Sequence, residues 1–165
     1  MSNDWSIITP VLNKYQNIDE TSTVQNHPLG FRVQAFHATY NVCEFVYCAG
    51  VASTIATDWV TIGEDFATTR LVADAVGPVG VAMSANVASQ WGWYCIYGTV
   101  IGGSGAAIAD NAAIYIHGTA GLVDDTVVDG DMVHNAFARS VISGASITGK
   151  FQIAYPYTDN INSND

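Results

Sequence analysis

Four histidines are the side chains of this sequence best suited to hold a metal ion or to move a proton, and they are His27, His37, His117 and His134. Histidine metal sites usually show two ligands at a short, fixed spacing, such as i and i+2 on a strand or i and i+4 on a helix. No two of these histidines have such a spacing. The nearest approach to a metal cluster is His134 beside Asp129 and Asp131, which we expect to form a solvated turn instead.

The acidic segment 124–131 (DDTVVDGD) has the composition of a calcium-binding loop but not its spacing. An EF-hand loop places oxygen ligands at alternate positions and a glutamate at its twelfth position. Val127 and Val128 occupy the middle of the segment, and no glutamate follows at the required distance. We therefore expect an acidic turn that faces water, with Asp129 and Gly130 as its turn dipeptide.

The glycine-rich segment 98–110 (GTVIGGSGAAIAD) has the look of a phosphate-binding loop because close glycines follow an expected strand. It lacks the third glycine or alanine of the dinucleotide-binding fingerprint, and no Gly-Lys-Ser/Thr follows. Ser104 lies between glycines but not in a Gly-x-Ser-x-Gly nucleophile elbow. We expect this segment to be the flexible tip of a hairpin.

Neither a nucleophile nor a pair of carboxylates has a partner that the sequence can identify. Cys95 would need a distant histidine as its base, and it lies within the apolar segment 91–98 (WGWYCIYG), where a buried structural role is expected. Glu64 and Asp65 are adjacent, so they would point to opposite faces of a strand, whereas glycosidases need two carboxyls that face one sugar. We predict no catalytic residue, no cofactor and no metal, and hence no enzyme.

The aromatic residues of segment 91–98 leave three interpretations open. Trp91, Trp93 and Tyr97 share one face of the expected strand, and Tyr94 and Ile96 share the other. Both faces are therefore apolar. Such a strand could be covered by the protein core on both sides, could contact a second subunit on one side, or could offer a platform to a sugar.

Composition and charge exclude several classes of partner. The 165 residues carry 15 acids and 5 bases, for a net charge of −10, and only 12% of them are charged, against about 25% in ordinary soluble domains. The five bases are scattered singly, so the clustered positive charge that nucleic-acid binding needs is missing, and an acidic membrane surface would repel the chain. A surface so poor in charge suggests that other protein covers much of it.

Three cysteines and one apolar segment indicate whether the chain carries disulfides or a membrane span. Cys43, Cys48 and Cys95 are an odd number, and Cys43 and Cys48 point to opposite faces of a strand, so we expect free, buried thiols. The apolar segment 77–100 is interrupted by polar residues, a proline and glycines, so it does not predict a membrane span. The first ten residues show no secretory signal.

From Phe31 onward, runs of four to eight β-branched and aromatic residues alternate with Gly, Pro, Asp and Asn. This pattern is typical of strands, and turn signals every 8 to 12 residues indicate an all-β barrel or sandwich. A turn is expected at Gly77 and Pro78. One or two short helices are expected, over 84–91 (SANVASQW) and over 131–142 (DMVHNAFARSVI).

The chain is expected to divide into an extended N-terminal arm over residues 1–30, a β-rich domain over 31–157 and a polar C-terminal tail over 158–165. The arm is polar apart from five apolar residues, which are Trp5, Ile7, Ile8, Val11 and Leu12. A free tail would gain nothing from these side chains. We therefore expect them to pack either on the domain itself or on a neighbouring subunit.

Several motifs together resemble a family of tailed-bacteriophage structural proteins. The most specific are GVAST (50–54), GPVGVAMSA (77–85) and WGWYCIYG (91–98), and the resemblance covers about His27 to Ala138. Members with an assigned role are similar to capsid decoration, or cement, proteins with a small β-barrel or β-tulip fold, which sit on the outer capsid and are often trimers. The family implies no catalytic residue.

The resemblance implies a virion structural protein that stabilises the outer capsid by bridging neighbouring capsid proteins. It would be made in the host cytoplasm, and its partners would be the major capsid protein and its own copies in a homotrimer. Eight residues are the expected interface, which are Trp5, Ile7, Ile8, Val11, Leu12, Trp91, Trp93 and Tyr97.

Two other classes of function stay open. One is a minor tail or fibre protein that binds host glycans through surface aromatics, which exposed tryptophan rings would favour. The other is a small phage enzyme, which a bound metal or a deep pocket containing His117 or His134 with aspartates would favour.

Overall fold

The computed structural model describes residues 4–11, 14–145 and 147–161. Within these residues the chain forms strands and turns but no helix, so the prediction of an all-β fold is confirmed. The eleven strands of this part of the chain are β1 (Trp5–Ile7), β2 (Arg32–His37), β3 (Asn41–Ala49), β4 (Trp59–Ile62), β5 (Thr68–Arg70), β6 (Gly77–Ala82), β7 (Trp91–Ser104), β8 (Ala113–Ile116), β9 (Val123–Asp124), β10 (Met132–Ala138) and β11 (Ile147–Thr158). Since the described residues form no helix, they provide none that could span a membrane.

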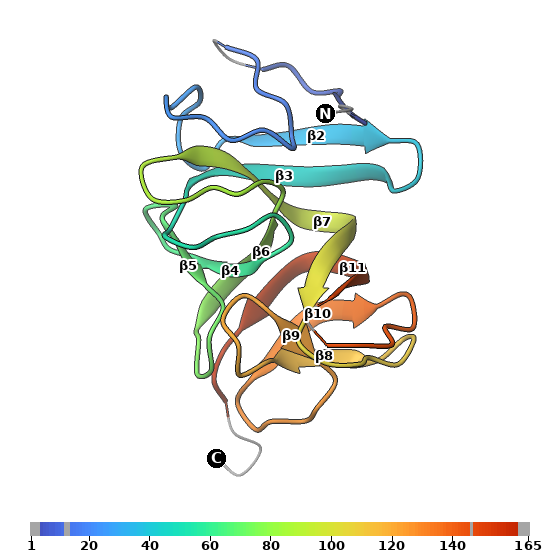
Figure 1. The fold of residues 1–165 in the computed structure, drawn as a ribbon. Coiled ribbons are helices and arrows are strands. Elements are labelled where there is room, and N and C mark those ends of the chain that lie inside the picture. The colour runs from blue at the N-terminus through green and yellow to red at the C-terminus, as the bar shows by residue number, and fades with distance from the viewer. Residues whose placement is uncertain (1–3, 12–13, 146, 162–165) are drawn as a thin grey trace.

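The short helices expected over 84–91 and 131–142 are wrong. The first segment forms bends and a turn that lead into β7, and β10 occupies most of the second (Figure 1). In β10, Ala136 and Ala138 are buried whereas Phe137 is exposed. The spacing of the large apolar residues looked helical because small alanines hold the buried positions of an alternating strand.

The strands form one sheet that closes on itself twice. β7, β9, β8, β10 and β11 pair in that order and β11 returns to β7, which gives a ring that we call the C-terminal barrel. β3, β7, β6, β4 and β5 form a second ring, the N-terminal barrel, which the bridge between Ala49 and Ala67 closes. β7 belongs to both rings, and Figure 1 shows it running from the β2–β3 part of the molecule to the part with β8, β9 and β10.

β7 passes from one barrel to the other at Gly98. Residues up to Tyr97 pair with β3, and residues from Tyr97 to Ser104 pair with β11. Gly98 has a φ of +111°, and a Cβ at this position would lie 2.5 Å from Sγ of Cys43. Any side chain here would be strained and would collide with the sulfur, so the bend requires glycine.

Both faces of β7 are covered by side chains of the same chain. Trp93 and Cys95 belong to the main core, which receives residues from every strand except β5. Tyr94 and Ile96 belong to a second, smaller core inside the N-terminal barrel. The prediction that segment 91–98 is a strand is confirmed, and of the three interpretations left open for its two faces, core packing is the one observed for these four residues.

The described residues of the expected N-terminal arm pack on the β domain rather than extending from it. β1 pairs with β2, and the buried ring of Trp5 meets that of Phe45 at a centroid distance of 4.9 Å. Ile18 is fully buried in the main core. Of the two partners expected for the apolar residues of segment 1–30, the domain itself is the one observed.

Gln16 fastens this N-terminal segment to the sheet. Its buried side chain donates to the carbonyl of Trp91 at 3.0 Å and accepts from the hydroxyl of Tyr47 at 2.7 Å. Its own carbonyl accepts from the indole N–H of Trp93 at 3.1 Å. These bonds satisfy polar groups that would otherwise be buried without partners, so a polar residue is required here.

At the other end of the chain, Thr158 is the last residue of β11. The polar tail expected from residue 158 therefore starts one residue later than predicted. Residues 162–165 of that tail lie outside the described residues.

Two turns predicted from glycine are strand segments instead. Gly77 and Pro78 begin β6, and Gly102 and Gly103 lie within β7. A Cβ at Gly102 would lie 2.8 Å from Nε1 of Trp59, and this indole N–H donates to the carbonyl of Gly103 at 3.1 Å. The glycines of β7 make room for a buried tryptophan, which a turn signal cannot reveal.

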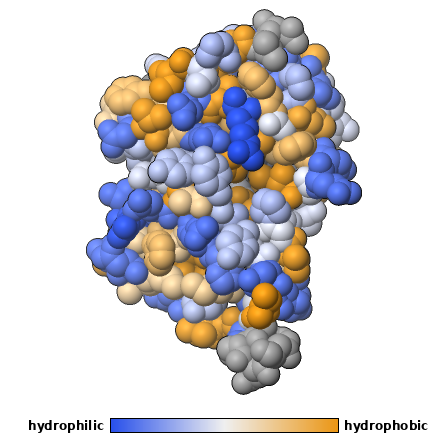
Figure 2. Space-filling model, turned by 180° about the vertical axis from the view of Figure 1, so that it is seen from behind, coloured by the Kyte–Doolittle hydropathy of each residue, from blue (hydrophilic) through white to orange (hydrophobic). Residues whose placement is uncertain are grey.

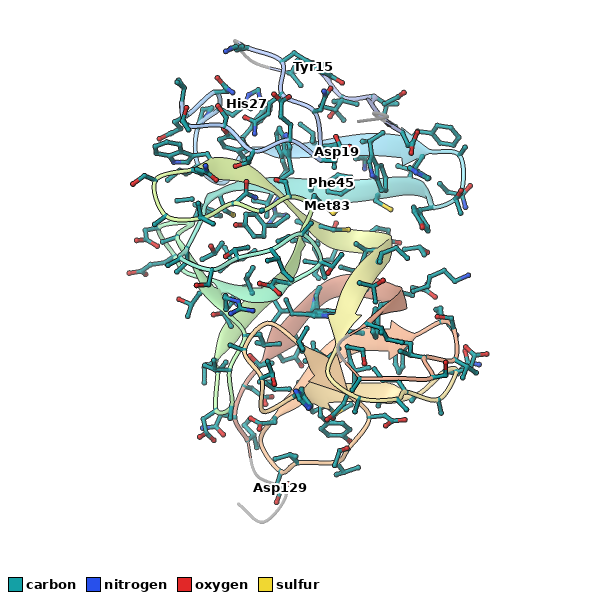
Figure 3. All side chains as sticks on the ribbon, viewed as in Figure 1. Tyr15, Asp19, His27, Phe45, Met83 and Asp129 are labelled. Carbon is teal, nitrogen blue, oxygen red and sulfur yellow. The ribbon has the colours of Figure 1, made fainter. Side chains whose placement is uncertain are left out.

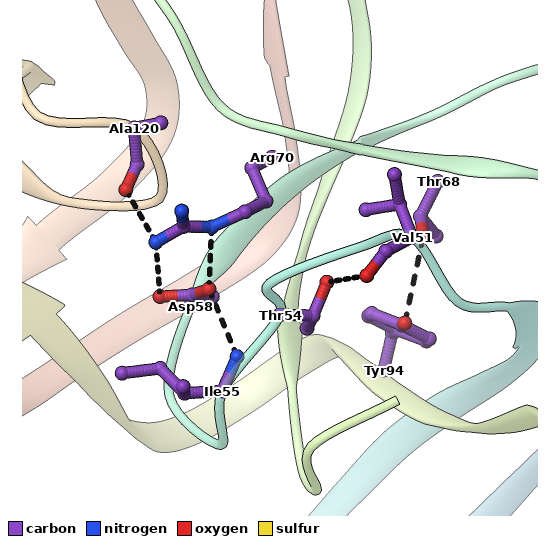
Figure 4. Close-up of polar contacts among 8 residues, drawn as sticks. All are labelled: Val51, Thr54, Ile55, Asp58, Thr68, Arg70, Tyr94 and Ala120. Atoms are coloured by element: carbon purple, nitrogen blue, oxygen red, sulfur yellow. Dashed lines mark hydrogen bonds and ion pairs between the residues drawn. The ribbon is translucent and has the colours of Figure 1, made fainter. Parts of the chain in front are cut away.

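An ion pair between the buried Asp58 and the half-buried Arg70 of the N-terminal barrel also reaches the C-terminal barrel (Figure 4). Nε of Arg70 in β5 donates to Oδ2 of Asp58 at 2.8 Å, and its Nη2 donates to the carbonyl of Ala120, between β8 and β9, at 2.8 Å. The backbone N–H of Ile55 donates to the same carboxylate at 3.0 Å. Because the carboxylate of Asp58 is completely buried and hydrogen-bonded on several sides, we assign this pair a structural role.

Candidate functional site

A cavity of about 840 Å³ opens at one end of the N-terminal barrel, and we call it the groove. Five parts of the chain contribute to it, namely β2 with β3, the β4–β5 turn, the start of β6, the middle of β7 and the end of β11. The lining residues are Arg32, Val46, Ile62, Gly63, Glu64, Phe66, Val76, Gly77, Pro78, Val79, Ile96, Tyr155, Pro156, Tyr157 and Thr158.

The floor of the groove is apolar because it is the open end of the smaller core. Val46, Ile62 and Ile96 belong to that core and also line the groove. Phe66 packs against the same core from the β4–β5 turn. Val76 stands at the margin with 66% of its surface exposed. Mouths of small β-barrels with apolar walls are common places for ligands to bind.

Charged and aromatic side chains stand at the rim of the groove. Nη1 of Arg32 lies 3.6 Å from Oε1 of Glu44, and its guanidinium carbon lies 6.0 Å from the ring centre of Tyr155. The hydroxyl of Tyr155 donates to Oε2 of Glu44 at 2.9 Å. Glu64 has no ion-pair partner among the described residues. The rim therefore carries one cation and two carboxylates.

Thr158 contributes a buried hydroxyl to the wall of the groove. The residue is 2% exposed, and its Oγ1 has no hydrogen-bond partner among the described residues. A buried hydroxyl without a partner costs about 1–3 kcal/mol. Thr158 is thus a place where the sequence departs from the best choice for stability.

The groove holds no recognisable catalytic set. Among its described lining residues there is neither a histidine nor a cysteine, and Glu64 is the single carboxylate. The hydrogen bond from Tyr155 to the carboxylate of Glu44, followed by partial burial, raises the pKa of the phenol, so Tyr155 stays protonated at neutral pH. The groove thus offers apolar surface and hydrogen-bonding groups rather than a nucleophile with its base.

The candidate metal residues are not brought together. Nε2 of His134 lies 3.3 Å from Asp159, and its ring stacks on that of Tyr157. Asp131 instead accepts from the backbone N–H of Asp74 at 2.8 Å. No group of three or more His, Cys, Asp or Glu in the described residues could hold a metal ion.

His27 lies far from the acidic turn. Figure 3 shows His27 in the N-terminal segment at one end of the molecule and Asp129 in the loop before β10 at the opposite end. His27 is packed among the rings of Phe31, Tyr47 and Trp93, with centroid distances between 5.1 and 5.6 Å. It is a core residue in this fold.

The eight predicted interface residues have very different exposures. Trp5 and Trp93 are buried, so they cannot touch a partner without unfolding; Ile7, Val11 and Trp91 are half-buried; Ile8 and Tyr97 are exposed; and Leu12 lies outside the described residues. The ring of Tyr97 lies 5.4 Å from that of Tyr155, at the rim of the groove. The strand from 91 to 98 thus serves mainly the core and reaches the surface only at its end.

Apolar side chains also lie on the outer face of β2 and β3. Phe36 and Val42 are directly opposite one another in the ladder, and both are exposed. Arg32 and Val46, which line the groove, are opposite partners in the same ladder. The face seen in Figure 2 shows apolar residues gathered in several patches between hydrophilic ones. The outer face of β2 and β3 therefore continues the surface of the groove.

The prediction of free, buried cysteines on opposite faces is confirmed. Cys43 lies in the main core and Cys48 in the smaller core, and all three thiols are free and buried. Burial raises the pKa of Cys48 to about 12 and that of Cys95 well above its usual value. A hydrogen bond with Cys95 lowers the pKa of Cys43. Two of the three thiols are thus poor nucleophiles at neutral pH.

The groove itself was missed by sequence reasoning. Its members come from positions as far apart as Arg32 and Thr158, and no local motif connects them. One weak signal in the sequence is Pro156, because a proline near the end of a strand marks an edge or an exit from the sheet. Comparisons of the chain with protein-family models, with curated proteins and with solved structures gave no match.

Proposed function

We propose that this protein is a virion structural protein that decorates the outer capsid of a tailed bacteriophage and stabilises the shell by bridging neighbouring capsid proteins. The observation that carries the proposal is the groove, which offers a large apolar surface with no nucleophile, histidine or metal cluster among its described residues. Such a surface is suited to binding rather than to turnover. The resemblance over residues 27–138 supplies the identity of the assembly.

The fold is consistent with this role in a second respect. A decoration protein that bridges two neighbours needs two separate contact surfaces. The groove, together with the outer face of β2 and β3 that continues it, is one, and exposed apolar residues on the C-terminal barrel, such as Phe137 of β10 and Val141 after it, offer another. Repetition of one weak bridge over a whole shell makes the summed stabilisation large. Assembly of the chain as a homotrimer belongs to the same proposal.

A minor tail or fibre protein is the second candidate. Exposed tryptophans would favour glycan binding, but all four tryptophans of the chain are buried or half-buried. The observation that keeps this candidate is the pair of exposed tyrosines at the rim, Tyr97 and Tyr155. Sugars stack on exposed aromatic rings, although the apolar lining of the groove offers them few hydrogen bonds.

The test is the copy number of the chain in purified parent particles, measured by mass spectrometry against the major capsid protein. A ratio near one to one, or a simple fraction of it, is expected for a decoration protein. A few copies per particle would instead indicate that the protein belongs to the tail or a fibre. Absence from the particle would refute a virion role.

A further inference from the structure

We propose that the groove binds one extended, apolar segment of a partner polypeptide that carries a lysine or arginine next to its apolar residues. This inference rests on the proposed function, because it names the kind of segment through which the protein would bind the shell protein.

The apolar surface is elongated rather than confined to the cavity. Within the groove it includes Val46, which is opposite Arg32 in the β2–β3 ladder. Along the same face of the two strands follow the pair Glu44–Gln34 and then the exposed pair Val42–Phe36. An extended polypeptide rises about 3.3 Å per residue and turns alternate side chains to one face, so it matches a linear track of this kind. A compact small molecule would use the cavity alone.

The charges at the rim favour a basic occupant. Arg32 is already paired with Glu44, at 3.6 Å. Glu64 also lines the groove and has no ion-pair partner among the described residues. The rim therefore has an excess of one negative charge, and the whole chain has a net charge of −10. An anionic occupant such as a fatty acid would be repelled, whereas a lysine or arginine beside the apolar residues would be attracted.

Val76 provides the test of occupancy. It lines the groove and is 66% exposed, so Val76→Lys places a positive charge in the groove without disturbing the core. Val127, which is 75% exposed and lies outside the groove, gives the matched control Val127→Lys with the same net charge. A second pair tests the charge at the rim. It compares Glu64→Gln with Asp110→Asn, since Asp110 is exposed and also lies outside the groove.

The first experiment needs no particle. A displayed library of random twelve-residue peptides is selected against the full chain, and the enriched peptides are measured by fluorescence anisotropy. We expect apolar peptides with a lysine or arginine, bound at least tenfold more weakly by Val76→Lys and several-fold more weakly by Glu64→Gln. Both control variants should match the wild type within about twofold. The inference would be overturned if the enriched peptides bound Val76→Lys as tightly as the wild type, or if no peptide were enriched.

The second experiment uses the parent particle. A photo-crosslinking amino acid at position 76, and separately at position 127, is incorporated and the protein is added to particles that lack it. We expect the crosslink from position 76, and not the one from 127, to map to an apolar segment of the shell protein with an adjacent basic residue. Binding to particles without any crosslink from position 76 would refute the groove while leaving the virion role intact. Failure to bind particles, with peptides still bound, would refute the virion role alone.

Two other occupants are outcomes of the same work. Native mass spectrometry of the purified chain would reveal a bound lipid. A lipid that Val76→Lys displaces would overturn the proposal that a polypeptide occupies the groove. Light scattering would reveal self-association through the groove. An oligomer that Val76→Lys dissociates, and Val127→Lys does not, would identify a second copy of this chain as the occupant and would also overturn the proposal.

Discussion

The hydroxyl of Tyr155 donates a hydrogen bond of 2.9 Å to Oε2 of Glu44, although 111 positions separate the two residues. The bond joins the end of β11 to β3 across the rim of the groove. Tyr155 has a φ of +53°, which turns it out of the strand ladder between Ala154 and Pro156. A positive φ is costly for a tyrosine, so the contact with Glu44 holds a strained residue at the rim of the groove.

The first prediction concerns the ionisation of Tyr155. The carboxylate of Glu44 accepts its proton in a hydrogen bond, and this raises the pKa of the phenol above 10. Glu44→Gln should therefore lower the pKa of this tyrosine. The measurement is a titration of tyrosinate absorbance. Subtracting the titration curve of Tyr155→Phe from that of the protein with Tyr155 isolates the contribution of this one tyrosine.

The raised pKa of Tyr155 also predicts how the stability of the fold depends on pH. Because the pKa is raised in the folded state, the contact stabilises the fold below the unfolded pKa near 10, and this contribution is lost as the pH rises through the folded pKa. The difference in unfolding free energy between wild type and Tyr155→Phe should accordingly be constant at neutral pH and shrink in alkali. A difference that grows in alkali would contradict the assignment.

The second prediction concerns the attachment of the N-terminal segment. Gln16→Ala should lower the free energy of unfolding by about 2–4 kcal/mol, because it removes the acceptor for the hydroxyl proton of Tyr47 and one of the donors to the carbonyl of Trp91. Urea denaturation measures the change. Gln34→Ala, at an exposed position of β2, is the control and should cost less than about 0.5 kcal/mol. Equal effects of the two variants would mean that Gln16 does not hold the segment in place.

The third prediction compares two buried threonines. Thr158→Val should leave stability unchanged or raise it by up to about 1 kcal/mol, because Oγ1 of Thr158 makes no hydrogen bond with the described residues. Thr68→Val should lower stability by about 1–2 kcal/mol, because Oγ1 of Thr68 donates to the carbonyl of Ala49 at 2.8 Å. The two residues are 2% and 5% exposed, so burial is matched. Thermal unfolding distinguishes them, and a similar loss in both variants would show that Thr158 has a hydrogen-bond partner in solution.

The fourth prediction concerns the thiols. Cys48 and Cys95 have raised pKa values because they are buried, so little of either is in the thiolate form that reacts. We expect the native protein to resist iodoacetamide at about pH 8 and the denatured protein to be alkylated at all three cysteines. Mass spectrometry of partly modified protein should find Cys43 first, since its pKa is lowered by the bond with Cys95. Early modification of Cys48 would indicate that the N-terminal barrel opens.

Local sequence patterns predicted the strands well where large apolar residues alternate. Segment 91–98 has aromatic residues on both faces, and the structure covers both faces with separate cores. The pattern failed in β10, where alanines take the buried positions, and at Gly102, where glycine admits the ring of Trp59 rather than forming a turn. In both cases the identity of a neighbour distant in sequence decides what a small residue does.

In the N-terminal segment, too, a local pattern does not show which residues are buried, and here the buried residues are polar. Gln16 and His27 lie in a stretch whose composition predicts an exposed arm, yet both are buried. A polar side chain can be buried when distant groups satisfy it, as Tyr47 and Trp91 satisfy Gln16. Composition measures the cost of burial but not the partners that offset it.

The residues alone indicate that this protein is all-β and that its thiols are internal, and they give it a net charge of −10. These properties follow from the alternation of side chains along a strand and from the sum of the charges, which are local or additive quantities. The position of the groove depends instead on pairings distant in sequence, because the groove exists only once β7 and β11 pair and the N-terminal barrel closes. Those pairings join residues tens of positions apart, and the side chains that line the groove share no spacing that a linear pattern could display.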